Sequence, residues 1–257
     1  MNTKSIWQFG AFIIGDELLS GKRNDKHFTF LRSALRQRGF ELKWLQILPD
    51  EPDLLVEAFQ WSLTRKHEGV FSFGGIGATP DDHTRQVVAQ ATGNPLEPHQ
   101  EACQIIQTKF KKEAFPHRIK MADLPKGARL IPNPINQVPG FSIYQHHCLP
   151  GFPNMAHPMV EWILDTEYQA KHDETIETCL RVYTAESDLI PLMDQLLNLD
   201  PELKISSLPK AATQTTNRQM DLGIKGQLKA VQLAEQQATQ YLNEQNYRWE
   251  KVDLQFH

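Results

Sequence analysis

The chain has 257 residues, of which 40% are hydrophobic and 23% are charged, and its formal net charge is −4 with an isoelectric point near 6.2. This length and composition suit a globular protein with one large domain, or with a larger and a smaller one. A mildly acidic chain has no general attraction for nucleic acid or for anionic membranes, so we expect neither as a partner. Three widely separated cysteines without a CxxC spacing support neither a disulfide framework nor a zinc site, and the N-terminal apolar run is too short for a signal peptide or a membrane span; we therefore expect a cytoplasmic protein.

The first two thirds of the chain alternate apolar runs with helical patterns. Strands are predicted at residues 6–15, 41–48, 69–73 and 128–132, with a hairpin at 141–144 and 147–149. Helices are predicted around 28–35, 54–63, 81–92, 100–112 and 155–164. This order of strands and helices predicts an α/β fold with an open, mostly parallel sheet covered by helices.

The composition becomes polar around residues 166–174, and we place a domain boundary there, between a domain at 1–168 and a second at 175–257. The second part predicts a strand at 178–184, a helix at 188–199, strands at 204–208 and 219–226, and a helix at 228–244. This order is that of a small α+β domain with a β-α-β-β-α pattern.

A glycine-rich loop follows the predicted strand at 69–73. Residues 74–84 read Gly-Gly-Ile-Gly-Ala-Thr-Pro-Asp-Asp-His-Thr, and this spacing is neither a dinucleotide-binding GxGxxG nor a Walker A motif. The glycines let backbone amides approach a ligand closely, and Asp81 and Asp82 follow at the predicted start of a helix. Because amides bind anions and carboxylates do not, the two together indicate a phosphate held with a magnesium ion.

Two further loops are expected near this one. Asp16 and Glu17 follow the first strand, and the carboxyl ends of parallel strands share one edge of a sheet, so these carboxylates are expected beside Asp81 and Asp82. Four carboxylates repel one another unless a cation or bound protons intervene. The alternative is that Asp81 or Asp82 caps a helix without any ligand.

The third loop, residues 149–154, contains Gly151 and Pro153 and enters a predicted helix. It is either an anion-facing corner formed by free helix amides or only a proline-rigid turn. The neighbouring His146 and His147 lie on a predicted strand and therefore point to opposite faces, which does not suit a shared metal ion.

Together these segments resemble the MoaB/Mog-type domain, the molybdopterin-binding fold of molybdenum-cofactor biosynthesis, and are most similar to the N-terminal domain of CinA-like competence/damage-inducible proteins. The matching segments are residues 15–21, 74–84, 131–134, 139–141 and 149–153, in the family's order, within a region of resemblance at about 5–165.

The resemblance implies a three-layer α/β domain that binds a pterin phosphate or an adenine nucleotide at the glycine loop and that forms dimers or trimers. There are two departures. Ile76 stands where molybdopterin-handling members commonly have a hydroxyl residue, which weakens the pterin option, and Ala78 replaces a proline frequent in CinA-like loops. The site residues implied by the resemblance are Asp16, Glu17, Gly74, Gly75, Gly77, Thr79, Asp81 and Asp82, with Gly151 and Pro153 as the far wall.

Two functions are compatible with these patterns. The first is a metal-dependent site, with magnesium or another divalent ion, that hydrolyses or transfers at a nucleotide diphosphate such as ADP-ribose. There the glycine amides hold the phosphates, Asp81 and Asp82 hold the metal, and Asp16 or Glu17 orients the attacking water. The second is a non-catalytic molybdopterin- or nucleotide-binding protein, and an interaction scaffold is a third reading. The deamidase activity of CinA proteins is not expected.

Overall fold

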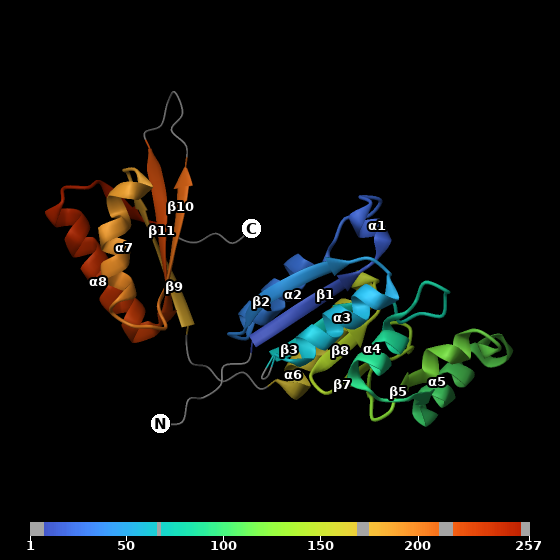
Figure 1. The fold of residues 1–257 in the computed structure, drawn as a ribbon. Coiled ribbons are helices and arrows are strands. Elements are labelled where there is room, and N and C mark those ends of the chain that lie inside the picture. Colours follow the sequence, from blue (N-terminus) through green and yellow to red (C-terminus); the bar gives the residue numbers. More distant parts are fainter. Residues whose placement is uncertain (1–7, 66–67, 169–174, 211–217, 253–257) are drawn as a thin grey trace. The chain divides into compact units, whose positions relative to one another are not determined.

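The chain forms two compact units, Met1–Lys171 and His172–His257 (Figure 1). The computed structural model describes residues 8–65, 68–168, 175–210 and 218–252. The predicted start of the first strand, at residues 6–7, and the predicted boundary at 169–174 lie outside the described residues. Each unit has its own hydrophobic core.

The large unit is built on a six-stranded sheet with the order β2-β1-β3-β8-β7-β6. The first four strands in this order run parallel, and β7 and β6 are antiparallel to their neighbours. The prediction of a mostly parallel sheet is confirmed. The strands are β1 (Gln8–Ile14), β2 (Glu41–Leu48), β3 (Glu68–Phe73), β6 (Arg129–Ile131), β7 (Gly140–Ile143) and β8 (His146–Leu149).

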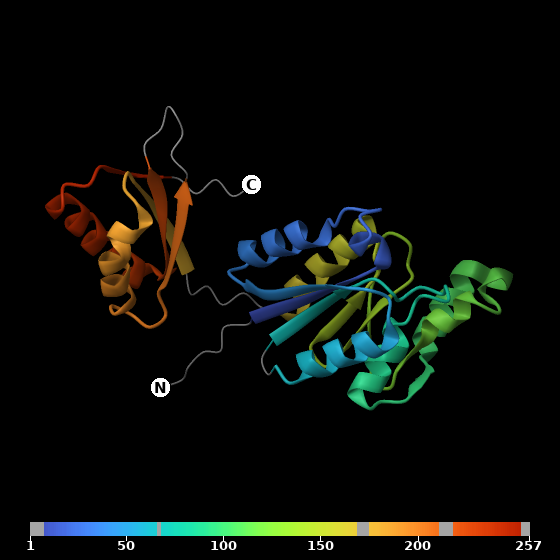
Figure 2. The ribbon, with the colours of Figure 1, turned by 45° about the horizontal axis from the view of Figure 1, so that its top comes forward.

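Alternate residues of β1 face two separate cores, as the twofold period of a strand requires. Phe9, Ala11 and Ile13 pack with helices α2 and α6, whereas Phe12 and Ile14 pack with α3 and α4 on the other face. The two helix layers are visible on opposite sides of the sheet in Figure 2. The helices are α2 (His27–Gln37), α3 (Pro52–Leu63), α4 (Thr84–Thr92) and α6 (Pro153–Glu167), and a single turn, α1 (Asp16–Leu19), follows β1.

Residues 94–127, between α4 and β6, form a lobe that the sequence predicts only as one helix. We call it the α5 lobe. Its helix packs Ala102 and Ile106 into the core under α4. The lobe contains β4 (Leu96–Pro98), α5 (Gln100–Phe110), 3₁₀ turns at Lys111–Ala114 and Arg118–Ala122, and β5 (Asp123–Pro125), which pairs with β4.

The small unit is a four-stranded antiparallel sheet, β10-β11-β9-β12, and its core joins the sheet to two helices. The strands are β9 (Thr175–Val182), β10 (Lys204–Lys210), β11 (Gln219–Gln227) and β12 (Trp249–Lys251), and the helices are α7 (Ile190–Leu197) and α8 (Leu228–Glu244). The last strand was not predicted. No helix in the described ranges of either unit is both long and apolar enough to cross a membrane.

His146 and His147 are structural residues of β8. Nε2 of His146 shares a hydrogen bond with Ser62 on one face, while His147 bonds Ser142 and the hydroxyl of Tyr168 through its two ring nitrogens. Burial lowers the pKa of His146 to about 4 and, together with neighbouring positive charge, lowers that of His147 to about 3. Both rings are therefore neutral in the folded protein at physiological pH.

These two histidines predict a loss of stability in acid. In the unfolded chain they titrate near pH 6.5, so below that pH the unfolded state binds more protons than the folded state. The free energy of unfolding should fall as the pH drops from 6.5 towards about 4, with a slope approaching about 1.4 kcal/mol per pH unit for each histidine. Urea denaturation at pH 7, 6 and 5 measures it. His146→Gln should reduce the slope and the exposed His117→Gln should leave it unchanged; equal stability at pH 7 and 5 in the wild type would contradict the argument.

Candidate functional site

A cleft of about 450 Å³ opens at the carboxyl edge of the parallel strands. β1 lies between β2 and β3, so the loops after β1 and β3 leave in opposite directions and create a crevice at this switch point. The loops that follow β1, β3 and β8 all contribute walls. The three loops singled out in the sequence thus meet at one place.

Most of the predicted site residues line this cleft, but two do not. Asp16 is an exposed residue beside the rim, and Pro153 borders a smaller hollow of about 30 Å³. The predicted residues that line the cleft are Glu17, Gly74, Gly75, Gly77, Thr79, Asp81, Asp82 and Gly151.

The start of the glycine loop is held so tightly that only glycine fits. Gly74 and Gly75 have φ angles of 108° and 68°, and a Cβ on Gly74 would lie 2.4 Å from the carbonyl oxygen of Ile14. The amide of Gly74 donates to the Leu149 carbonyl at 2.9 Å, and the hydroxyl of Thr84 donates to the Gly74 carbonyl at 2.9 Å. The loop is therefore fixed to β1, β8 and α4 at once.

Asp82 closes the loop from within. One carboxylate oxygen accepts the N–H of Gly77 at 2.9 Å, and the other accepts the N–H of Thr79 at 2.8 Å and its hydroxyl at 2.5 Å. Both aspartates were expected in the first turn of a helix, but α4 begins only at Thr84. The helix starts later because Asp82 satisfies the amides of the loop and not those of the helix.

The closure by Asp82 changes which amides are available. The N–H groups of Gly77 and Thr79 are occupied, whereas those of Gly75, Ile76 and Ala78 have no acceptor in the described part of the chain. All three of these residues line the cleft. The amides open to a ligand are therefore not simply those of the glycines.

Arg85 supports the same loop from below and was not singled out in the sequence. Its side chain is buried, and Nη1 donates to the carbonyls of Ile76 at 2.8 Å and Gly77 at 2.6 Å. Its Nε is buried with no partner among the described residues, and burial lowers its pKa although the charges of Asp82 and Asp123 oppose that shift. A buried guanidinium without a directly bonded carboxylate gives the loop a positive potential. In the sequence Arg85 reads only as part of a helical pattern.

Asp50 is a second residue that the sequence reading missed. It follows β2 and lines the cleft. Its carboxylate accepts the backbone N–H of Asp16 at 3.2 Å, and its own backbone N–H donates to the carboxylate of Asp16 at 3.3 Å. Burial raises the pKa of Asp50, and the negative charges of Asp16, Glu17 and Asp81 raise it further. The edge rule that placed Asp16 applies equally to Asp50, because β2 is also parallel to β1.

The carboxylates of Glu17, Asp50 and Asp81 form an acidic rim of the cleft, in which Glu17 is paired with Arg23 at 3.3 Å. Hydrogen bonding with Thr79 lowers the pKa of Asp81, which therefore stays ionised. Within the described residues, however, no three acidic, histidine or cysteine side chains are grouped closely enough to hold a metal ion by themselves.

Apolar side chains form another part of the cleft lining. Phe152 is 54% exposed, with the guanidinium of Arg23 at 6.0 Å from its ring centroid, and it offers a flat surface to a planar ring. No local pattern in the sequence marks these residues, because they come from four separate segments. The remaining lining residues in this part are Ile76, Phe110, Met121, Val138 and Met155, with the amides of Asn133 and Asn136.

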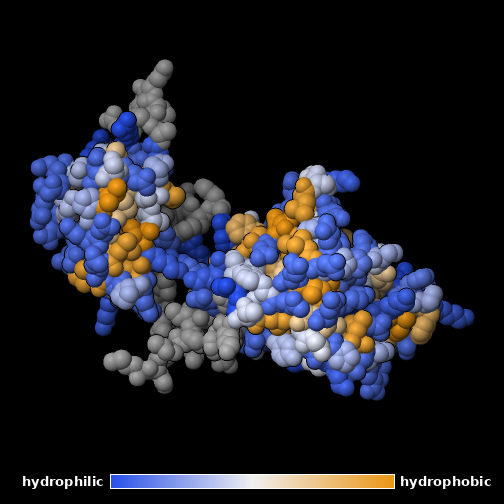
Figure 3. All heavy atoms as spheres, in the orientation of Figure 1, coloured by the Kyte–Doolittle hydropathy of each residue, from blue (hydrophilic) through white to orange (hydrophobic). Residues whose placement is uncertain are grey.

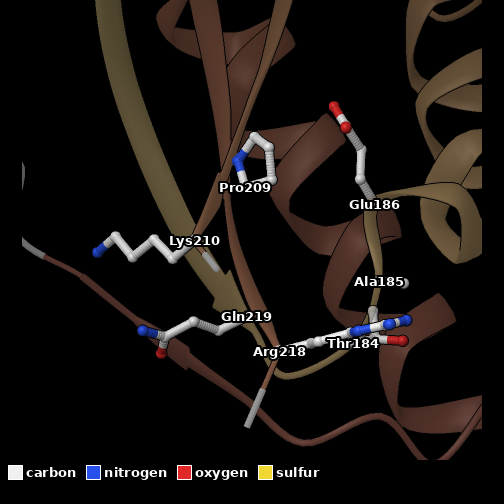
Figure 4. A pocket seen from close by; sticks show the side chains of 7 residues that line it. All are labelled: Thr184, Ala185, Glu186, Pro209, Lys210, Arg218 and Gln219. Carbon is white, nitrogen blue, oxygen red and sulfur yellow. The ribbon is translucent and has the colours of Figure 1, made fainter. Parts of the chain in front are cut away.

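The small unit has a hollow of its own, of about 430 Å³, lined by residues of β10 and β11 and of the turn after β9. In Figure 4 Lys210 and Gln219 extend to one side, and Arg218 and Thr184 to the other. Lys210 pairs with Asp221 at 2.9 Å, and Glu186 accepts a hydrogen bond from Ser207. Because these polar groups already have partners inside the unit, we take the cleft of the large unit as the site.

Comparisons with known proteins identify the family to which the large unit is similar. Residues 10–170 match a family model described as a probable molybdopterin binding domain. A protein of Pyrobaculum arsenaticum is 30% identical over 220 residues, which cover 77% of this chain and 78% of that protein. The crystal structure of CinA from Thermoplasma acidophilum, described as a protein of unknown function, is 26% identical, covers 62% of this chain and 97% of that one, and has a TM-score of 0.56. The MoaB structure from Thermus thermophilus is 20% identical, covers 63% of this chain and 91% of that one, and has a TM-score of 0.41.

The tight packing of Gly74 gives a test of the loop geometry. Gly74→Ala should destabilise the large unit by about 1–3 kcal/mol, because its φ is unfavourable for alanine and its Cβ would meet a backbone oxygen that cannot move aside. Gly151→Ala is the matched control across the cleft, since its nearest neighbour, the Cα of Gly74, would be at an ordinary 3.4 Å. Chemical denaturation of both variants measures the difference. Equal midpoints would show that the loop is not held as described.

Proposed function

This chain belongs to the family of probable molybdopterin binding domains, and we propose that its cleft binds a nucleotide diphosphate with a divalent metal ion and hydrolyses the diphosphate. The family match and the structural likeness to CinA confirm the resemblance expected from the glycine loop and its companion segments. The family description points to a small pterin ligand, and the nucleotide diphosphate is proposed from the chemistry of the cleft.

The observation that carries the proposal is that groups favouring an anion and groups favouring a cation line the same cleft. The amides of Gly75, Ile76 and Ala78 have no acceptor among the described residues, and they lie in the loop supported by the buried cation of Arg85. The carboxylates of Glu17, Asp50 and Asp81 line the same cleft, and of these Glu17 is paired with Arg23 at 3.3 Å. An anion favoured by the amides and a cation favoured by the carboxylates are what a metal-bound phosphate supplies.

The carboxylates fit magnesium held partly by the ligand. Mg²⁺ is usually bound by one or two carboxylates together with substrate phosphate oxygens and water, not by a complete protein cage. This agrees with the lack of a three-residue metal group among the described residues. When bound, such an ion neutralises charge on the phosphoryl oxygens and makes water more acidic. Because both oxygens of Asp82 accept hydrogen bonds within the loop, Asp81 suits the metal better than Asp82 does.

Asp50 suits the role of proton acceptor. Burial and its acidic neighbours raise its pKa, which makes it a stronger base than an exposed aspartate. Asp16 holds Asp50 in place through two backbone hydrogen bonds, and Glu17 is a second base at the same rim. In the proposed reaction a water oxygen bonds to one phosphorus, the bond from that phosphorus to the bridging oxygen breaks, and Asp50 takes the proton of the water. ADP-ribose would thus give AMP and ribose 5-phosphate.

A second function, binding of a nucleotide or pterin without chemistry, is favoured by one observation. Both oxygens of Asp82 are engaged inside the loop, so the residue expected to act on metal and substrate serves instead as a structural cap. The pterin version is weakened by Ile76, an apolar residue that packs partly into the core beneath the loop. The two functions differ in turnover and not in the site of binding.

Turnover of ADP-ribose separates the two functions. With Mg²⁺ the protein should release AMP, and Asp50→Asn should lower kcat by about a hundredfold or more, because the asparagine side chain cannot accept the proton. Asp53→Asn, at an exposed aspartate in the first turn of α3, is the matched control and should leave the rate unchanged. AMP release is measured by chromatography, with thermal stabilisation by ligand measured in parallel. Stabilisation without turnover under any divalent metal would favour the binding protein, and neither effect would contradict both functions.

Arg85 gives a test of the phosphate end. Arg85→Met should weaken ADP binding about tenfold, because it removes the positive charge beneath the free amides. Arg85→Met should change the free energy of unfolding of the free protein much less than it changes ADP binding, because the substitution also removes the cost of burying an incompletely paired cation. Arg85→Lys keeps the charge and should bind between the two. Isothermal titration measures affinity; an unchanged ADP affinity in Arg85→Met would show that Arg85 has only a packing role.

A further inference from the structure

The α5 lobe supplies part of the cleft wall. Two of its residues, Phe110 at the end of α5 and Met121 in the second 3₁₀ turn, line the cleft. The lobe is anchored by Ala114 and Ala122, which are fully buried in the core. Its wall of the cleft is therefore a fixed part of the fold.

The segment that carries these two residues is strongly basic. Residues 109–120 contain five lysine or arginine residues and a single carboxylate, Glu113, in a chain whose overall net charge is −4. The cations alternate with the lining residues: Lys109 and Lys111 flank Phe110, and Lys120 precedes Met121. Figure 3 shows a largely hydrophilic surface over the lobe, with hydrophobic residues in small groups between.

Contacts with Phe110 hold part of this charge at the wall of the cleft. The guanidinium of Arg118 lies 4.6 Å from the ring centroid of Phe110, and the ammonium of Lys109 lies 5.5 Å from it. Such cation–π contacts fix a charged group beside the ring without neutralising it. Phe110 therefore presents to the cleft a ring that is flanked by positive charge.

Most of these cations have no acidic partner. Arg118 pairs with Glu113, but within the described ranges no carboxylate pairs with Lys109, Lys111 or Lys120. Lys126, elsewhere in the lobe, does have one, in Glu97. The positive charge of these three lysines is therefore free to pair with an anionic ligand.

The cleft is therefore lined both by the glycine loop with its neighbouring carboxylates and by Phe110 and Met121 of the α5 lobe, with cations beside Phe110. A ligand whose diphosphate and metal ion occupy the glycine loop leaves the apolar lining for a ring, and its remaining part can reach the lysines next to Phe110 and Met121. We propose that the ligand carries a second phosphate group remote from the diphosphate, bound by Lys111 and Lys120 with Lys109 beside them. This inference rests on the proposed function, because it assumes a nucleotide diphosphate at the glycine loop.

Two pairs of probe ligands test it, each pair differing by one remote phosphate: NADP⁺ against NAD⁺, and coenzyme A against dephospho-coenzyme A. Titration calorimetry with Mg²⁺ should give about tenfold to hundredfold tighter binding of the phosphorylated member, the range expected for one or two charge-assisted hydrogen bonds. The preference for the phosphorylated member should also shrink as the salt concentration is raised, because Lys111 and Lys120 are exposed to solvent.

Variants assign the preference to the lobe. Lys111→Gln combined with Lys120→Gln should bring the affinity ratio within each pair close to one, while the affinity for NAD⁺ and dephospho-coenzyme A stays at the wild-type value. Lys126→Gln, at an exposed lysine of the same lobe that is paired with Glu97 and is not adjacent to a lining residue, should keep the full preference.

The outcomes separate this inference from the function it rests on. Binding of all four ligands with equal affinity within each pair would overturn the second phosphate and leave the diphosphate site standing. A preference that survives in the double variant would overturn the role of these lysines. Failure of all four to bind with metal present would overturn the proposed function, and this inference with it.

Discussion

The architecture of the site depends on one close contact between two backbones, that of Gly74 with Ile14 at the ends of β3 and β1. No side chain fits there, since a Cβ on Gly74 would lie 2.4 Å from the Ile14 carbonyl oxygen. The same glycine donates to Leu149 at the end of β8, so a single residue joins the ends of three parallel strands. The cleft lies at the switch point because that contact draws the glycine loop back across the edge of the sheet.

Once the loop is fixed there, two charged residues of opposite sign complete it. Asp82 accepts its amides at Gly77 and Thr79, and Arg85 donates to its carbonyls at Ile76 and Gly77. These contacts pair two N–H groups and two carbonyl groups of the loop that would be costly to leave unpaired. The amides of Gly75, Ile76 and Ala78 remain without an acceptor among the described residues, and the charge of Arg85 lies close to them. The loop is therefore held in place by the protein alone, and its remaining N–H groups can still donate to a ligand.

The sequence predicted the sheet and the convergence of loops because both follow from local periodicity and from the direction of parallel strands. The first and last residues of β2 and α8 were predicted correctly, because the spacing of apolar residues marks them clearly. The same rule was not extended to Asp50, which lies at the same edge. The late start of α4 was missed because the preference of Asp82 for loop amides over helix amides is decided by tertiary geometry. Phe110 and Met121 could not have been placed, because no local pattern shows where an inserted lobe packs.

The charge arrangement also couples the binding of metal and nucleotide in the cleft. A nucleotide without metal would bring its phosphates against the carboxylates of Glu17, Asp50 and Asp81, and a metal ion without nucleotide would find no complete set of protein ligands among the described residues. Each ligand therefore lowers the cost of binding the other. By linkage the coupling must be reciprocal, so the metal raises nucleotide affinity by the same factor as the nucleotide raises metal affinity. On the proposed function, the partner that this cleft recognises is the metal–nucleotide complex and neither component alone.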